Sequence, residues 1–340
     1  MTRQPRKRLP TMSDIARLAG VSRTTVSFVL NQHVSSASIP AETRDRVLEA
    51  AKKLTYRPNL AAKVLHTNQT HTIGFITDEI AITPHAVDII RGAQDAAWAN
   101  GKLLLIVNTG SDATVRETAV EMMLGRQVEG IIYAAMYHHE VALPANMHEG
   151  SAVLLDCFSA DRSLPSVVPD EIQGGRTATE VLLNKGHRRI GFINTVDRTP
   201  AALGRLEGYK QALQAYDVPF DENLVRSHFG ESRGGYQGTL ELLQLREPPT
   251  AIFCFKDLMA MGAYDALRTL GLSIPGDVAV MGFDNQELIA AQLSPPLSTM
   301  QLPHYQMGKW AVEFLLEYNG ESLPPVQHTI DCPYIERQSV

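Results

Sequence analysis

Apolar residues recur at helical spacing through the first part of the chain, without the alternation that is typical of strands. Ile15, Leu18 and Ala19 predict the inner face of a first short helix, which Thr11 can cap and Gly20 can end. A second helix would follow Ser22 and a third would follow Pro40, with inner faces formed by Val26, Val29 and Leu30 and by Val47, Ala50, Ala51 and Leu54. Three short helices are therefore expected over residues 11–57.

After Pro58 the segment to Thr70 is polar and could form one short helix, so we interpret residues 58–71 as a linker. From Thr72 onward, short apolar runs alternate with longer amphipathic segments. The predicted strands are Ile73–Thr77, Leu103–Val107, Val128–Tyr133, Val153–Leu155, Ile190–Asn194, Ala251–Cys254 and Val278–Phe283. The predicted helices are Val87–Trp98, a stretch ending at Leu124, Gly174–Leu183, Ala202–Ala215, Gly234–Leu243 and Leu258–Leu270.

Alternation of strands and helices builds parallel sheets covered by helices on both faces. Residues 72–340 are too many for one such sheet, so we expect two doubly wound α/β lobes. A further helix over Met307–Leu316 follows the last strand predicted for the second sheet, which indicates that the chain crosses back to the first lobe. The expected lobes are about 72–165 plus about 298–325, and 166–297 plus the C-terminal segment, with a ligand between them.

The formal net charge of the chain is −6, but it is divided unevenly. Residues 1–70 contain 12 Lys and Arg against 4 Asp and Glu, whereas the remaining residues contain 19 against 33. A small basic region on an acidic body concentrates the attraction for phosphate groups at one end. Basic N-terminal tails are also common in other proteins, so charge alone leaves nucleic-acid binding open.

Cysteine usage and the N-terminus indicate the cellular compartment. Cys157, Cys254 and Cys332 lack the paired spacing of a metal site, and their odd number does not suggest a disulfide framework. The basic N-terminal segment is followed by Pro10 and a polar helix, which is not the pattern of a signal peptide. No stretch approaches the ~18 apolar residues of a membrane helix. We therefore expect a cytoplasmic protein without a membrane partner.

The second predicted helix carries the residue types that read DNA. Gly20 and Ser22 predict a tight turn before it, and its outward residues are Arg23, Thr24, Thr25, Ser27, Phe28 and Asn31. Arg23 can contact guanine with two hydrogen bonds, and Thr24 can pack on a thymine methyl group. Thr25 and Ser27 suit phosphate contacts, which set register. The simpler alternative is a small solvated helical domain.

Several motifs together carry a resemblance to a known family. They are TMSDIARLAGVS (11–22), TVS (25–27), VLN (29–31), ETR (42–44), VLEAA (47–51), YRPN (56–59), GHRRI (186–190), RLEGY (205–209), DLMA (257–260) and VMGFD (280–284). In this order the chain resembles the lactose/galactose repressor (LacI/GalR) family of transcriptional regulators. The resemblance implies a helix-turn-helix headpiece over residues 1–57 and a body like that of periplasmic binding proteins.

The resemblance also implies a homodimer whose two headpieces bind the half-sites of a pseudo-palindromic operator in double-stranded DNA. Further DNA contacts implied by it are made by Thr11, Met12, Ser22, Thr43 and Tyr56. The linker is then expected to fold on DNA as a hinge helix, with Asn59 and Ala62 facing the groove and Leu65 wedged between base pairs. Without the resemblance, Leu65 would be interpreted as an ordinary packing partner of the next domain.

Two features of the headpiece depart from the family pattern. Phe28 stands where an arginine is common, so either the operator offers an apolar contact or Phe28 packs on the headpiece. The loop 32–39 is also slightly longer than usual, which leaves its phosphate contacts open.

In the body, the resemblance points to an effector site between the lobes. Arg205 matches the effector-binding arginine of the family, and Asp284 matches the aspartate after the last strand of the second lobe. Such a pair can bracket several hydroxyl groups of a sugar by charge-assisted hydrogen bonds. Asp78 and Asp156 follow first-lobe strands and could contribute from the other wall, and Phe229 could supply a stacking face. For each aspartate alone, a helix cap is an almost equal alternative.

Lys256 is a third departure, because many relatives have a neutral side chain there. It could favour an acidic or phosphorylated effector, or it could pair with Asp284 or Asp156 in the empty cleft.

An enzyme is the main rival interpretation, followed by a solute-binding protein using the same cleft. The body has no glycine-rich dinucleotide fingerprint, no phosphate loop and no Gly-x-Ser-x-Gly elbow. His138, His139 and Glu140 with His148 come nearest to a metal cluster, but adjacent histidines on a strand point apart, which favours a solvated loop. A transport protein would need a signal sequence and would lack the headpiece.

We therefore expect no enzyme activity, metal or cofactor. The sequence predicts a DNA-binding transcriptional regulator, in the simplest case a repressor, whose operator affinity is switched by a small effector such as a sugar. The sequence does not distinguish an inducer from a corepressor, or a dimer from a tetramer.

Overall fold

The computed structural model describes residues 10–30, 39–57, 69–83, 86–318 and 324–340. The chain divides into two compact units, Met1–Thr70 and His71–Val340. Asn31, Asn59, Ala62 and Leu65, which the sequence assigned to DNA contacts, lie outside the described residues.

The first unit consists of the helices α1 (Met12–Ala19), α2 (Arg23–Leu30) and α3 (Ala41–Lys53). The Thr11 side chain caps α1 in a capping box with Asp14, and Gly20 ends the helix in the left-handed conformation with φ 66°. The Ser22 hydroxyl accepts a hydrogen bond from the Thr25 backbone at 3.0 Å at the start of α2. The predicted helices and caps are confirmed, around a small core of Ile15, Ala19, Val26, Val29, Val47 and Ala50.

The second unit contains two six-stranded sheets. The first sheet has the order β11 (Gln327–Ile330), β5 (Ser166–Pro169), β4 (Ala152–Phe158), β3 (Ile131–Glu140), β1 (Thr72–Thr77), β2 (Leu103–Asn108). The second has the order β12 (Tyr334–Ile335), β10 (Ser298–Gln301), β9 (Ala279–Asp284), β8 (Ala251–Cys254), β6 (Ile190–Thr195), β7 (Val225–His228). Neighbouring strands are parallel, apart from the antiparallel pair β10–β12.

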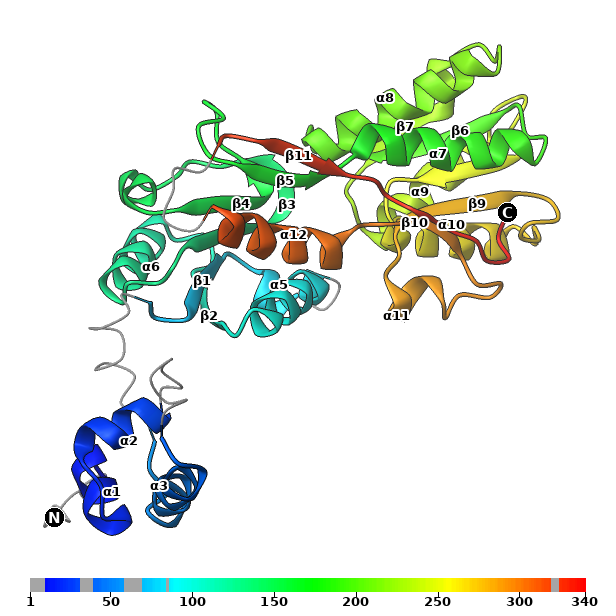
Figure 1. The fold of residues 1–340 in the computed structure, drawn as a ribbon. Coiled ribbons are helices and arrows are strands. Elements are labelled where there is room, and N and C mark those ends of the chain that lie inside the picture. Colours follow the sequence, from blue (N-terminus) through cyan, green and yellow to red (C-terminus); the bar gives the residue numbers. More distant parts are fainter. Residues whose placement is uncertain (1–9, 31–38, 58–68, 84–85, 319–323) are drawn as a thin grey trace, which may run out of the picture. The chain divides into compact units, whose positions relative to one another are not determined.

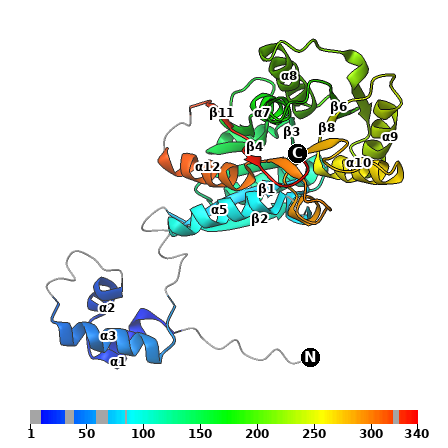
Figure 2. The ribbon, with the colours of Figure 1, turned by 90° about the vertical axis from the view of Figure 1, so that its right-hand side faces the viewer.

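Helices cover both faces of each sheet (Figures 1 and 2). The helices of the first lobe are α5 (Val87–Ala99), α6 (Ala113–Gly125) and α12 (His304–Glu317). Those of the second lobe are α7 (Glu171–Asn184), α8 (Pro200–Ala215), α9 (Ser232–Leu243), α10 (Asp257–Thr269) and α11 (Glu287–Ala290). Short 3-10 turns span Ile80–Ile82, Ala145–Glu149 and Glu222–Leu224.

Successive strand residues enter opposite hydrophobic cores, as the two-residue period of a strand requires. On β1, Phe75 packs in the core beneath α5 and α12, whereas Ile76 packs in the core beneath α6. On β8, Phe253 packs with α7 and α8, whereas Ile252 packs with α9 and α10. This double burial explains why the strands read as continuous apolar runs in the sequence.

The chain crosses between the lobes three times, and the crossings move the lobe boundaries that we expected. Ser166–Pro169 and Gln327–Ile330 pair in the first sheet, although the sequence placed them in the second lobe. Ser298–Gln301 pairs in the second sheet, although the sequence placed it in the first lobe. The crossing back to the first lobe before α12 was predicted correctly, since α12 packs on α5. The boundaries were misplaced because the crossing strands are only four residues long.

Candidate functional site

The exposed surface of α2 carries the predicted base-reading residues. Arg23 and Thr24 are exposed in the first turn of α2, and Thr25, Ser27 and Phe28 are partly buried along it. No acidic residue lies in this first turn, so the positive end of the helix dipole and the Arg23 guanidinium attract anions together. The helix therefore presents a polar, basic tip of the kind that enters a major groove.

The remaining described headpiece candidates have structural contacts of their own. Thr11 donates from its hydroxyl to Oδ2 of Asp14 at 2.7 Å, so its side chain belongs to the cap of α1. Met12 and Tyr56 pack against the headpiece core, and Thr43 is partly buried on α3. Each of these residues is thus partly engaged within the headpiece, and only its exposed atoms are available for the predicted DNA contacts.

In the second unit, helix α8 positions the predicted effector-binding arginine. The helix begins at Pro200, which suits the first helical position, and the Thr199 hydroxyl caps it by accepting from Ala202 at 3.2 Å. Gly208 of α8 and Gly175 of α7 let the two helices pack backbone to backbone, which leaves no room for a side chain between them. This close packing fixes Arg205 beside the start of α7.

Arg205 is 3% exposed and is held by two carboxylates. Its Nε donates to Oε2 of Glu171 at 2.7 Å, and its Nη1 lies 3.6 Å from Oδ1 of Asp284. The guanidinium also lies 3.6 Å from the centre of the Phe283 ring and donates to the carbonyl oxygen of Phe255. Burial opposes its charge, but the two carboxylates raise the pKa of Arg205 above its ordinary value. Arg205 is thus a fixed, permanent cation.

Asp78 follows β1, and Asp156 lies near the end of β4 rather than after it, so both belong to the first lobe. Asp78 accepts hydrogen bonds from the backbone amides of Glu79 and Met136, at 2.5 and 3.2 Å. Asp156 is 4% exposed, and within the described residues its Oδ1 has no hydrogen-bond partner. Burial, and then the nearby Glu171 carboxylate, raise the pKa of Asp156 well above its ordinary value of 3.8. Both oxygens of the Asp78 carboxyl thus accept hydrogen bonds, whereas one oxygen of Asp156 has no partner among the described residues.

The two lobes use a similar backbone feature at this site. Asp156 near the end of β4 has φ 56°, and Asp284 at the end of β9 has φ 106°. A positive φ is unfavourable for a residue with a side chain and persists where the surrounding structure holds it, often at ligand sites. Both carboxylates are therefore directed by strained strand ends.

Sequence reasoning missed Glu171 and misjudged His138. Glu171 is the first residue of α7, directly after the first crossing, and its Oε1 lies 4.0 Å from Nδ1 of His138 on β3. This contact joins the two lobes. Burial lowers the pKa of His138 to about 4, and the charges of Arg162 and Arg205 act in the same direction, so the ring is neutral. The four-residue strand before Glu171 has no strong pattern, so the sequence held no local signal for this residue.

Lys256 and Phe229 lie at the carboxyl ends of second-sheet strands. Lys256 directly precedes α10, and its side chain lies beside Gly230. A Cβ added to Gly230 would lie 3.1 Å from Nζ of Lys256. Within the described part of the chain, Lys256 forms neither of the ion pairs, with Asp284 or Asp156, that the sequence left open. Phe229 is 70% exposed between β7 and α9, so its predicted stacking face is accessible.

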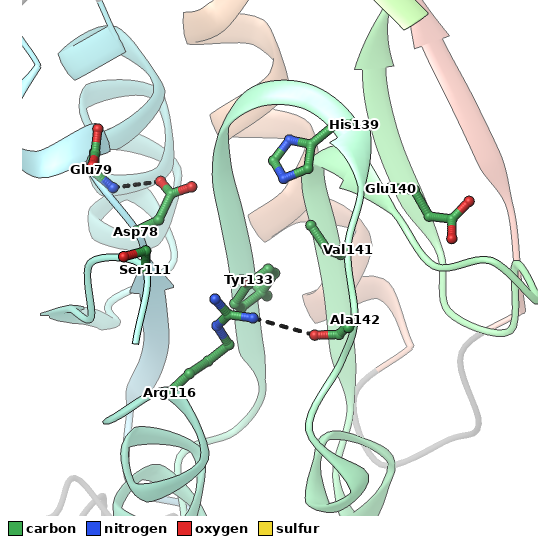
Figure 3. Close-up of a pocket in the computed structure, with 9 residues that line it drawn as sticks. All are labelled: Asp78, Glu79, Ser111, Arg116, Tyr133, His139, Glu140, Val141 and Ala142. Atoms are coloured by element: carbon green, nitrogen blue, oxygen red, sulfur yellow. Dashed lines mark hydrogen bonds between the residues drawn. The ribbon is translucent and has the colours of Figure 1, made fainter. Parts of the chain in front are cut away.

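A separate hollow lies in the first lobe, at the carboxyl ends of β1, β2 and β3 (Figure 3). Arg116 from α6 donates to the carbonyl oxygen of Ala142 at 3.3 Å, and its guanidinium lies 5.6 Å from the centre of the Tyr133 ring. The other lining residues are Asp78, Glu79, Ser111, His139, Glu140 and Val141. Asp78 therefore borders this hollow, and its charge also acts on Asp156.

The residues that the structure describes contain neither a metal-binding cluster nor a membrane-spanning helix. No group of three or more His, Cys, Asp and Glu residues there could hold a metal ion. His138 instead faces Glu171, and His139 lines the first-lobe hollow. In the same residues, no helix combines the length and apolar character needed to cross a membrane.

Comparisons with known proteins decide the family. A model of bacterial regulatory proteins of the lacI family matches residues 11–59, and a model of the periplasmic binding protein-like domain matches residues 179–340. The ribose operon repressor of Haemophilus influenzae is 34% identical over 91% of this chain and 92% of its own length. The chain belongs to the lacI family of bacterial regulatory proteins. This lacI-family protein is also 32% identical to the transcriptional repressor PurR of Vibrio atlanticus, over 91% and 92% of the two chains.

Solved structures agree with the fold of this lacI-family protein. The Lac repressor dimer bound to operator and the anti-inducer ONPF is 27% identical, with a TM-score of 0.78 over 98% of this chain and 99% of that chain. A transcriptional regulator from Rhizobium etli is 34% identical, with a TM-score of 0.71 over 79% and 98% of the two chains. The predicted family, fold class and role as a DNA-binding transcriptional regulator are confirmed, and the relatives named here are regulators.

Proposed function

We propose that this protein is a cytoplasmic, homodimeric repressor whose affinity for a pseudo-palindromic operator is switched by a small carbohydrate effector. The observation that carries the proposal is the joint presence of an exposed basic reading helix and a buried arginine that two carboxylates hold where the lobes meet. The repressor names of its relatives, and the ribose operon of one of them, support the same interpretation.

In this proposal, the first turn of α2 reads the operator in the major groove. Arg23 makes two hydrogen bonds to a guanine, and Thr24 packs against a thymine methyl group. Thr25 and Ser27 contact phosphates, together with Ser22, Thr43 and Tyr56. Phe28 stands where relatives have a charged residue and makes an apolar contact, either with the operator or within the headpiece.

The linker completes the operator contact. Asn59 and Ala62 face the minor groove, and Leu65 is wedged between two base pairs. An inserted apolar side chain unstacks the bases at a cost of a few kcal/mol, which the contacts along the bent duplex offset.

Effector binding changes the population that can bind DNA. A ligand held by Arg205 and Asp284 from the second lobe and by Asp156 and Asp78 from the first stabilises one arrangement of the lobes. Only a ligand with different affinities for the two arrangements can shift their equilibrium. Whether the ligand releases the operator or promotes binding follows from which arrangement it prefers.

The reading helix is tested by selecting operator sequences from random DNA and measuring affinities for the selected and for scrambled duplexes. Arg23→Ala should weaken binding to the selected duplex about 5- to 150-fold, as the loss of about 1–3 kcal/mol predicts. Arg17→Ala is the matched control, because Arg17 is an exposed α1 cation paired with Asp14. Equal losses for both duplexes in Arg23→Ala would show that Arg23 reads no base.

The effector site is tested by thermal denaturation with sugars, sugar acids, sugar phosphates and nucleobases, since a ligand bound only by the folded state raises its melting temperature. We expect stabilisation by a sugar or sugar derivative. Stabilisation by nucleobases alone would contradict a carbohydrate effector and leave the repressor role standing.

A further inference from the structure

Asp156 is a buried carboxyl group of the first lobe whose hydrogen-bonding capacity is not fully used among the described residues. Its side chain is 4% exposed, and within the described residues its Oδ1 is fully buried without a hydrogen-bond donor. A buried carboxyl oxygen without a donor loses its hydration and gains nothing in return. The end of β4 nevertheless holds Asp156 in place at φ 56°, which indicates that the side chain is kept for a partner.

The groups that face Asp156 are mostly of its own charge. The largest charge effects on it come from Glu171 at the start of α7, the cation Arg205 on α8, Asp78 after β1 and Asp284 at the end of β9. Arg205 is already engaged by Glu171 and Asp284, at 2.7 and 3.6 Å. His138 is neutral and supplies no charge. Among the strongest of these influences, carboxyl groups therefore outnumber the guanidinium.

We propose that the effector carries a protonated amine, as an amino sugar does, and that the ammonium group binds Asp156. This inference rests on the proposed function and specifies in addition that the carbohydrate effector is positively charged. An ammonium group has three hydrogen-bond donors and no acceptor. It therefore suits Oδ1 of Asp156, which has no donor among the described residues and lies among carboxylates. Its charge offsets the excess of carboxylates, whereas a neutral hydroxyl group would donate without balancing any charge.

The electrostatics around Asp156 agree with this assignment. Burial and the neighbouring carboxylates raise the pKa of Asp156, which favours its protonated, neutral acid. A bound ammonium group would reverse this preference and release the proton. An anionic sugar would meet the same carboxylates and be repelled, and Lys256, which lies beside Gly230, forms no ion pair with them among the described residues.

The test compares three forms of one sugar skeleton. Glucosamine, galactosamine and mannosamine are each measured against the N-acetyl form, which has lost the charge, and against the parent sugar. Binding to the full-length protein is followed by calorimetry and by melting temperature. We expect an amino sugar to bind about tenfold or more tightly than its neutral forms, the difference between a charged and a neutral hydrogen bond.

Two variants assign this preference to one residue. Asp156→Asn should reduce it to about threefold or less while the protein remains folded. Asp161→Asn removes an exposed carboxylate of the same lobe and should keep the full preference.

Three results would overturn the inference: equal binding of amine and parent sugar, no binding of any amine, or a preference that survives in Asp156→Asn. Tighter binding of sugar phosphates, lost in Lys256→Ala, would overturn it in favour of an anionic effector. A neutral sugar that still changes operator affinity would leave the proposed function intact, whereas no effect of any sugar on DNA binding would contradict the proposed function itself.

Discussion

The buried ion network around Arg205 is tolerated because each charge has a partner. Glu171 and Asp284 are held by the same guanidinium, and Asp284 accepts a further hydrogen bond from Gln286 at 3.1 Å. Removing the cation would leave two carboxylates facing each other in a site with little water. The destabilisation from breaking such a pair greatly exceeds the net stabilisation the pair provides.

Arg205→Ala should therefore lower the free energy of unfolding by about 3–5 kcal/mol, besides abolishing the effector response. Denaturant unfolding of the full chain measures the change. Arg176→Ala is the control, since the Arg176–Glu180 pair lies on the α7 surface and its loss should change stability little. Similar losses in both variants would contradict the special role of the Arg205 network.

Asp156 makes stability depend on pH. Its pKa is raised in the folded state, so the folded protein binds a proton more tightly than the unfolded chain. The resulting stabilisation is fully present below the ordinary value of 3.8 and is lost as the pH rises toward the raised pKa.

Asp156→Asn removes this titration and should stabilise the empty protein relative to the native chain at neutral pH, with the gain shrinking toward acidic pH. Denaturation midpoints over a pH series measure the effect. Asp161→Asn should give no such gain, because hydrogen bonds lower the pKa of Asp161. A gain that is independent of pH would contradict the assignment to Asp156.

Some residues of the candidate site could be predicted from the sequence, and others could not. Asp78 and Asp156 were predicted from their positions at the ends of strands, whereas Asp284, Lys256 and Phe229 were predicted from the resemblance to the family. Their contacts with an effector stay predictions. Glu171 escaped because it follows a four-residue strand without a strong pattern, and His138 escaped because its partner belongs to the other lobe. Contacts between distant segments carry no local signal.

At the scale of elements, the packing of α7 on α8 places the charged centre. An ideal Cβ at Gly208 would lie 2.1 Å from the Ile172 carbonyl oxygen, and one at Gly175 would lie 2.4 Å from that of Arg205. These distances leave room only for glycine, so the helices approach closely and bring Glu171 against Arg205. The same approach recurs between α5 and α12, where Gly308 faces the Ile89 carbonyl oxygen.

Gly208→Ala should push α7 and α8 apart and destabilise the protein by about 1–3 kcal/mol or more. Thermal or denaturant unfolding measures the loss. Gly125→Ala is the matched control, because no atom lies within 4 Å of a Cβ at this helical position. The control should be neutral or slightly stabilising, since alanine restricts the unfolded chain. A neutral Gly208→Ala would show that the helices can separate freely.

Elements with a strong periodic or apolar pattern were predictable. The predicted helices of the body and most of the predicted strands, including the four-residue β8, agree with the structure. The strand predicted over Val128–Tyr133 begins later and runs further, as β3 (Ile131–Glu140). The strands β5, β7, β10, β11 and β12 have two to four residues each and were missed. Two of these strands, β5 and β11, lie in the first sheet. Their positions depend on the strands with which they pair, and not on a pattern in their own sequences.

At the scale of the whole chain, the crossings make the lobes interdependent. The Asp170 amide donates to the Ile330 carbonyl oxygen at 2.9 Å, which links the first crossing to the third. The Cys332 amide donates to Oε1 of Gln173 at 2.8 Å, which ties the third crossing to α7. Glu171 therefore lies close to the segments that join the two lobes.

Leu65→Ala should separate operator binding from ligand binding. In our proposal, it weakens binding to the selected operator while leaving effector affinity unchanged, because the effector site lies in the second unit. Competition with random duplex distinguishes specific from general DNA binding. Equal losses for operator and random DNA would contradict the wedge.

The most direct test of the account is the operator affinity of the full-length protein with and without the compound that stabilises it most. A ligand-gated switch predicts that the compound changes the operator Kd by roughly 5- to 150-fold, and that operator changes the Kd of the compound by the same factor. Identical operator affinities with and without a saturating ligand would contradict it.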